Sequence, residues 1–221
     1  MEVTIPIDGT ESVSGLLESP AGATACLVLG HGAGAGMRHP FLEAVANGLA
    51  GHGVATLRYQ FPYMERKSRR VDPPDRCHAT VRAAVATAAR VAPNLPIFAG
   101  GKSFGGRMTS QAQGLEPLPG VRGLVFVGFP LHPAKKPTDT RGRHLVDVSI
   151  PMLFLQGSRD ELADLPLIQA LAFRLGDRAT LKVFDDADHS FHVRATSGRT
   201  DREVMTELNR ITKSWIDAVL A

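Results

Sequence analysis

A serine between glycines is the first feature of this chain whose setting suggests chemistry. The string "GKSFG" at residues 101–105 fits the pattern G-x-S-x-G, in which small residues permit a sharp turn between a strand and a helix. The apolar run "LPIFAGG" precedes it, and "GGRMTSQAQG", which can form a helix, follows. A plain turn or a phosphate-binding loop is the alternative, but neither the P-loop pattern nor G-x-G-x-x-G occurs. We therefore predict that Ser103 is a nucleophile.

A serine hydroxyl needs a base to remove its proton, and in this arrangement an acid and then a histidine follow the serine along the chain. Only His189 and His192 come after the last predicted strand, "TLKVF". His189 is the predicted base, because His192 lies where the chain can already turn toward the last helix. The loop after "PMLFLQG" supplies Asp160 as the acid that would orient the imidazole, with Asp164 as the alternative.

Acyl transfer also needs two donors directed at the oxygen that becomes negatively charged. The backbone N–H of Phe104, next to the predicted nucleophile, is one. The other is expected from the glycine-rich loop "GHGAGAGMRHPF", where glycines let the backbone approach a substrate. We assign it to Ala33, with Gly34 as the alternative. His31 is expected to brace this loop by hydrogen bonding.

The elements that must position these residues alternate along the chain. "VTIPI" and "SVSGLLESP" flank Asp8-Gly9, a hairpin signal. Apolar runs without alternation then indicate strands buried on both faces, and amphipathic or alanine-rich stretches between them indicate helices. This order predicts a mostly parallel sheet with an antiparallel N-terminal hairpin and helices on both faces. In such sheets the active groups lie beyond the carboxyl ends of the strands.

Composition limits the class of protein. The 221 residues fit one α/β domain over 1–221, and 25 basic against 22 acidic residues give only a mildly positive balance. The basic cluster at 66–76 is interpreted as a solvated loop and not a nucleic-acid site. Two cysteines outside any ligand pattern predict neither disulfides nor a metal site, and no run approaches a membrane span. We expect a cytoplasmic monomer or homodimer without cofactor, metal, nucleic-acid or membrane partner.

The chain resembles the α/β-hydrolase superfamily over essentially its whole length, and most of all its dienelactone-hydrolase-like branch. The resemblance rests on four strings that occur in order, "HGAGAG", "GKSFGG", "GSRD" and "DADHSF". The strings "RYQFPY" and "FPLHPAKKP" are similar to a small group of predicted hydrolases. That group includes the hydrolase-like region of a nuclear acetyltransferase-complex subunit and a testis-expressed protein. The resemblance implies a triad of Ser103, Asp160 and His189, but no substrate. Dienelactone hydrolases use cysteine as nucleophile, so dienelactone is a doubtful substrate here.

The walls of the site are predicted from residues near the same loops. The segment "PLHPAKKPTDTRGRHLVDVSI" is too short for a substantial cap, which predicts an open, shallow site. Apolar walls are expected from Met37, Phe61, Tyr63, Phe104, Phe129 and Leu131. Lys102, Arg107 and His132 are candidates to bind a carboxylate of the substrate. The residues expected to contact substrate are thus His31, Gly34, Met37, Lys102, Phe129, Leu131 and His132.

These features predict a serine hydrolase that cleaves carboxylic esters, or thioesters, through an acyl-enzyme. A peptidase or amidase with the same residues is one alternative. A non-catalytic interaction module on a hydrolase scaffold is the other, although such a module has no need of three chemically matched residues.

Overall fold

A computed structural model describes residues 1–221, and its centre is one eight-stranded sheet. The strand order is β1-β2-β4-β3-β5-β6-β7-β8. Strand β2 pairs antiparallel with both β1 and β4, and all other neighbouring strands pair in parallel. The predicted hairpin and mostly parallel sheet are therefore confirmed. The strands are β1 (Glu2–Pro6), β2 (Ser12–Glu18), β3 (Ala25–Gly30), β4 (Val54–Tyr59), β5 (Ile97–Lys102), β6 (Val121–Val127), β7 (Met152–Gly157) and β8 (Ala179–Phe184).

The central strands are buried on both faces, as the unbroken apolar runs of β5, β6 and β7 predict. Every residue of β3, β4 and β7 is buried. Helices cover both faces of the sheet, and side chains from both faces of a strand must pack against them. The edge strand β8 is only partly buried, which agrees with its more polar sequence.

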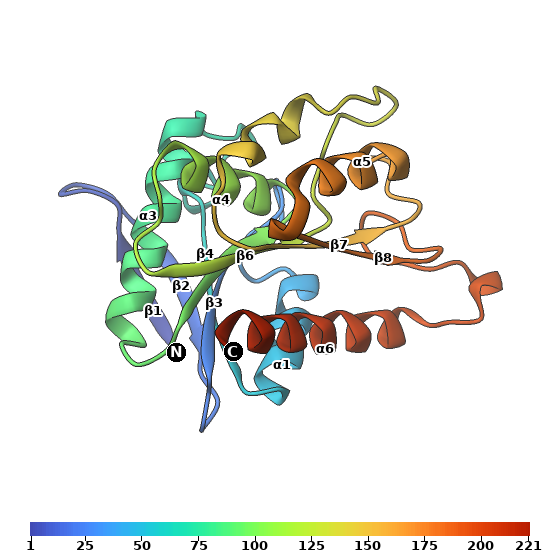
Figure 1. The fold of residues 1–221 in the computed structure, drawn as a ribbon. Helices are drawn as coiled ribbons and strands as arrows, with labels where there is room; N and C mark the ends of the chain where they lie inside the picture. The colour runs from blue at the N-terminus through green and yellow to red at the C-terminus, as the bar shows by residue number, and fades with distance from the viewer.

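The helices form two layers (Figure 1). In that view α3, α4 and α5 lie above the sheet, while α1 and α6 lie below it and contact each other. No helix combines the length and apolarity needed to cross a membrane. The helices are α1 (Pro40–Gly51), α2 (Pro62–Glu65), α3 (Pro74–Val91), α4 (Phe104–Leu115), α5 (Leu165–Leu175) and α6 (Asp201–Leu220).

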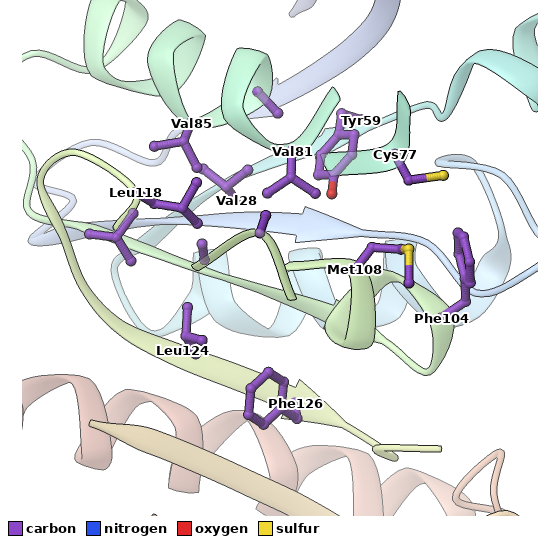
Figure 2. Close-up of a cluster of buried hydrophobic side chains, with 14 of the residues drawn as sticks. Val28, Tyr59, Cys77, Val81, Val85, Phe104, Met108, Leu118, Leu124 and Phe126 are labelled. Atoms are coloured by element: carbon purple, nitrogen blue, oxygen red, sulfur yellow. The ribbon is translucent and has the colours of Figure 1, made fainter. Parts of the chain in front are cut away.

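The larger part of the hydrophobic core lies between the sheet and α3 and α4. Figure 2 shows Val81 and Val85 of α3 on the same side of the sheet as Val28 of β3. Val81, Val85 and Ala88 follow one another at helical spacing and form one buried face of α3. A smaller cluster fills the space between the sheet and α1 and α6.

No cap covers the sheet, as predicted from the short segment between β6 and β7. That segment contains only a 3₁₀ helix over Thr140–Asp147, which packs against α4 and α5. The four-residue helix α2 lies between β4 and α3. Two further 3₁₀ turns, Gly176–Arg178 and Ala195–Ser197, complete the chain.

The core packing yields a test with two phenylalanines. Phe126 of β6 is fully buried, with its ring centroid 4.8 Å from that of Phe154, whereas Phe173 of α5 is 88% exposed. Phe126→Ala is expected to lower the free energy of unfolding by about 4 kcal/mol, because it leaves a cavity. Phe173→Ala should change it by less than about 0.5 kcal/mol. Chemical denaturation of both variants measures the difference, and equal losses would contradict this core.

Candidate active site

The candidate residues lie at the carboxyl end of the sheet, because the parallel strands that carry them all end there. Ser103 follows β5, Asp160 follows β7, and His189 follows β8. Ala33 follows β3, the strand that pairs with β5 on its other side. The parallel strands place these loops at the same end of the sheet, and the loop after β8 extends back past β7 and β6 toward Ser103.

Ser103 occupies a strained turn between β5 and α4. Its backbone has φ 50° and ψ −113°, a combination that residues with a side chain rarely adopt. The turn is tight because the backbone beneath it is in close contact with β3. A Cβ atom on Gly105 would lie 2.4 Å from the carbonyl carbon of Gly30, and one on Gly101 would lie 2.5 Å from the oxygen of Gly30. The glycines of G-x-S-x-G are therefore required by space.

Asp160 and His189 form a hydrogen-bonded pair. Nδ1 of His189 donates to Oδ2 of Asp160 at 2.7 Å, which leaves Nε2 free to accept a proton. The carboxylate is buried, and its oxygens also accept from Nε2 of Gln156 at 2.5 Å and from the N–H of Leu162 at 2.8 Å. Burying a carboxylate is costly unless it is hydrogen-bonded, and these three donors offset that cost. They also fix the direction in which Asp160 holds the imidazole.

The loop that carries His189 has its own internal supports. Oδ1 of Asp188 accepts from the N–H groups of Ser190 and His192, which closes a tight turn around His189. Phe191 has φ 62° and is buried against Phe184. A strained backbone of this kind persists only when its surroundings over-determine it, so the turn is held firmly.

Ser103 and His189 face the same cavity, although no hydrogen bond joins the serine hydroxyl to the imidazole in this structure. In serine hydrolases without substrate this hydrogen bond is often long, and it tightens when substrate binds. The cavity has a volume of about 430 Å³. It is lined by Gly32, Ala33, Ala35, His39, Phe41, Leu42, Lys102, Ser103, Leu162, His189 and Ser190.

The two N–H groups predicted to bind the oxyanion make no hydrogen bond within the protein. The N–H groups of Ala33 and Phe104 donate to no backbone or side-chain oxygen. The alternative donor, the N–H of Gly34, is instead engaged with the hydroxyl of Tyr63 at 3.1 Å. The geometry therefore favours Ala33 over Gly34 for this role.

His31 braces the loop that carries Ala33. Its Nδ1 donates to the oxygen of Gly32 at 2.8 Å, and its Nε2 accepts from the N–H of Phe61 at 3.1 Å. Burial lowers the pKa of His31 to about 4, so the ring is neutral and keeps both hydrogen bonds at neutral pH. Its full burial and its two partners place it beneath the cavity and not in contact with substrate.

Several residues predicted to contact substrate do not line the cavity. Phe129 and Leu131 are fully buried, and the ring of Phe129 packs at 5.9 Å from that of Phe154. His132 is buried, and its Nε2 accepts from the N–H of Asp164. The other predicted wall residues are buried and do not line the cavity either: Met37, Phe61, Tyr63 and Phe104. Gly34 is exposed, and neither it nor Arg107 is among the lining residues.

The cavity also contains residues that were not predicted from the sequence. His39 is the N-cap of α1, and Phe41 and Leu42 lie in its first turn, where no motif marked them. Leu162 and Ser190 are neighbours of Asp160 and His189 in the chain, so proximity to these two residues was the available signal.

Gly128 supports the site without lining it. It has φ 68°, and a Cβ atom there would lie 2.9 Å from Nζ of Lys102 and 3.3 Å from Cε1 of His189. Any other residue would be strained at this φ and would crowd the ammonium and the imidazole.

Lys102 is the one cation of the cavity wall. Burial lowers the pKa of its ammonium to about 8, although the charges of Asp160 and Asp188 oppose this shift. The side chain is therefore largely protonated at neutral pH. Its Nζ lies 5.7 Å from the centroid of the Phe41 ring, within the range of a cation–π interaction.

A second hollow can be set aside. It has about 530 Å³ and lies at the amino ends of β5 and β6, where Ile97 and Val121 begin these strands. No carboxylate, imidazole, thiol or hydroxyl side chain lines it. This hollow therefore offers no group for nucleophilic or acid–base chemistry.

Known proteins share this architecture. Residues 23–217 match the family model described as an alpha/beta hydrolase domain. The chain therefore belongs to this family, and its resemblance to the dienelactone-hydrolase-like branch is confirmed. Similar solved structures include a dienelactone hydrolase from Anabaena variabilis, with a TM-score of 0.77 and 22% identity over 99% of this chain and 96% of that one.

Two further solved structures share the fold. A lid-free α/β serine hydrolase from Xanthomonas campestris has a TM-score of 0.74 and 19% identity, and covers 97% of this chain and 94% of its own. Est1E from Butyrivibrio proteoclasticus has a TM-score of 0.72 and 16% identity, and covers 99% and 98%. At such identities the likeness establishes the uncapped α/β-hydrolase fold and nothing about substrate.

The strain at Ser103 can be measured without any substrate. Ser103→Gly and Ser103→Ala both remove the hydroxyl, but only glycine adopts φ 50° without steric cost. Relief of about 1–3 kcal/mol of strain exceeds the entropic cost of glycine, which is about 0.5–1 kcal/mol. Ser103→Gly should therefore be about 1 kcal/mol more stable than Ser103→Ala in chemical denaturation. A less stable glycine variant would contradict a strained turn.

Proposed function

We propose that this protein is a serine hydrolase that cleaves carboxylic esters by way of an acyl-enzyme. The observation that carries the proposal is the hydrogen bond between Asp160 and His189. It leaves Nε2 of the imidazole free in the cavity that Ser103 also lines. A base with a buried acid behind it and a serine beside it is the arrangement that acyl transfer requires.

In the first half of the reaction Ser103 is acylated. Nε2 of His189 removes the hydroxyl proton as Oγ bonds to the ester carbonyl carbon, and the carbonyl oxygen becomes an oxyanion. The N–H groups of Ala33 and Phe104 donate to that oxygen, and Asp160 stabilises the imidazolium. The carbon–oxygen bond to the leaving group then breaks, and His189 gives its proton to the departing alcohol.

In the second half water releases the acid. The neutral imidazole of His189 removes a proton from water, whose oxygen bonds to the acyl carbon. The same two N–H groups hold the second oxyanion. The bond from the carbon to Oγ of Ser103 breaks, and the imidazolium returns the proton to Oγ. The enzyme is restored and a carboxylic acid is released.

The shape and lining of the cavity indicate esters with a modest acyl or aryl group. Its volume of about 430 Å³ is at the small end for ligand sites. Its apolar lining comes mainly from Ala33, Ala35, Phe41, Leu42 and Leu162. No cap closes above it, so a longer leaving group can extend into solvent.

Short p-nitrophenyl esters test the proposal directly. The wild type should hydrolyse them, and Ser103→Ala should lower kcat by about 10⁴–10⁶-fold. A fluorophosphonate probe should form an adduct on Ser103, detected by mass spectrometry of the labelled peptide. An Ala variant with wild-type turnover would refute the assignment. An unlabelled, inactive wild type would favour the interaction-module interpretation.

The acid is tested with a matched pair of aspartates in one loop. Asp160→Asn should lower kcat by about 10³–10⁴-fold, because the amide can donate to Nδ1 and favour the tautomer that blocks Nε2. Asp164 caps α5 by accepting from the N–H of Leu167, a role that asparagine also fills. Asp164→Asn should therefore retain activity within about twofold. Steady-state kinetics decide, and the reverse order of effects would make Asp164 the acid.

A further inference from the structure

The side chain of Lys102 connects the two loops that hold the predicted nucleophile and base. Its Nζ donates to the main-chain oxygen of His189 at 2.6 Å. Lys102 is also the residue that precedes Ser103, at the end of β5. The Lys102 side chain therefore links the strained turn at Ser103 to the main chain of His189, which is 87 residues away in the sequence.

The surroundings of Nζ favour this contact over contact with solvent or an acid. The rings of Phe41 and Phe191 lie 5.7 and 5.9 Å from it. No carboxylate forms an ion pair with it, although Asp160 and Asp188 lie close enough to favour its charged form. A hydrogen bond from an ammonium in a partly desolvated place is stronger than one between neutral groups.

The other contacts of the loop do not reach the serine. Asp188 closes the turn within the loop itself, and His192 is tied to Asp201 at the start of α6. The N–H of Arg159 donates to the oxygen of Ala187, which fixes the loop to the one that carries Asp160. Lys102 supplies the connection between His189 and the turn at Ser103.

We propose that Lys102 is a positioning residue that sets the distance and angle between the His189 imidazole and the Ser103 hydroxyl. This inference rests on the proposed function. Sequence reasoning had assigned Lys102 to binding a substrate carboxylate, whereas the structure gives its ammonium a partner within the protein. A misplacement of about 1 Å in an active site can cost about 10²-fold in rate. The effect therefore falls on the chemical steps.

Removal and chemical restoration of the ammonium test the proposal. Lys102→Met keeps the length of the side chain and removes the donor, so kcat should fall by about 10–100-fold with KM within about threefold. In a Lys102→Cys variant, alkylation of the new thiol with 2-bromoethylamine rebuilds an ammonium at the length of lysine and should recover most of kcat. Cys26 and Cys77 are fully buried, so identically treated wild type should be unchanged.

A matched lysine supplies the control. Lys182 of β8 lies on the strand that leads to the His189 loop, and its side chain is 45% exposed. Lys182→Met should leave kcat within about twofold, in line with the small effects of surface substitutions. Unaltered kcat in Lys102→Met would overturn the inference. A rise in KM alone would do so too, and would return Lys102 to substrate binding.

Hydrogen exchange tests the same contact without turnover. Amides of residues 188–193 should exchange at least about tenfold faster in Lys102→Met than in wild type or Lys182→Met, because local opening follows the loss of a tie. Unchanged exchange would count against the inference. The two proposals fail differently: a wild type that neither turns over nor labels refutes the hydrolase, whereas exchange still decides whether Lys102 holds the loop.

Discussion

The close backbone contact between β3, the turn at Ser103 and the start of α4 is the constraint on which the rest of the site depends. Gly101 and Gly105 lie against Gly30 so closely that neither tolerates a Cβ atom. The start of α4 packs directly on β3 at this point, and the short turn between β5 and α4 places Ser103 in a strained conformation. That conformation raises the hydroxyl above the sheet and leaves the N–H of Phe104 without an acceptor at the first turn of a helix, where N–H groups are unpaired by construction.

The second requirement is a buried carboxylate whose charge is kept without a cationic side chain in contact. Asp160 is satisfied by an amide, a backbone N–H and an imidazole. A buried ion pair often costs about as much in desolvation as it returns, and a lysine or arginine bound to Asp160 would compete with His189. The ammonium of Lys102 stands near enough to act by charge but bonds to the His189 main chain instead. Lys102 thus supports the His189 loop without competing with the imidazole for Asp160.

The parts of the site that are fixed by the order of strands could be predicted from the sequence. A strand, a glycine-flanked serine, and loops after the last two strands define where Ser103, Asp160 and His189 lie, because parallel strands deliver their carboxyl ends to one edge. Residues whose direction depends on packing could not be predicted in this way. Phe129 and Leu131 follow the end of β6 within a few residues, at the same end of the sheet as Ser103, yet both are buried in the core. The contact of Lys102 with His189 joins a side chain to a backbone oxygen, and no pattern of residue types encodes such a contact.

The absence of a cap changes what must hold the site together. A capped hydrolase can close its catalytic loops from above, but here the segment between β6 and β7 packs against α4 and α5 and leaves the opening uncovered. The loops of the site must therefore be held by contacts beneath and beside the cavity. His31 and Tyr63 tie the loop of Ala33 to the segment after β4, and Lys102 ties the loop of His189 to the turn of Ser103. These contacts hold the loops of Ala33, Ser103 and His189 together while the cavity stays open to solvent. For the proposed ester hydrolysis, an open cavity with fixed walls suits substrates with a small acyl group and an unrestricted leaving group.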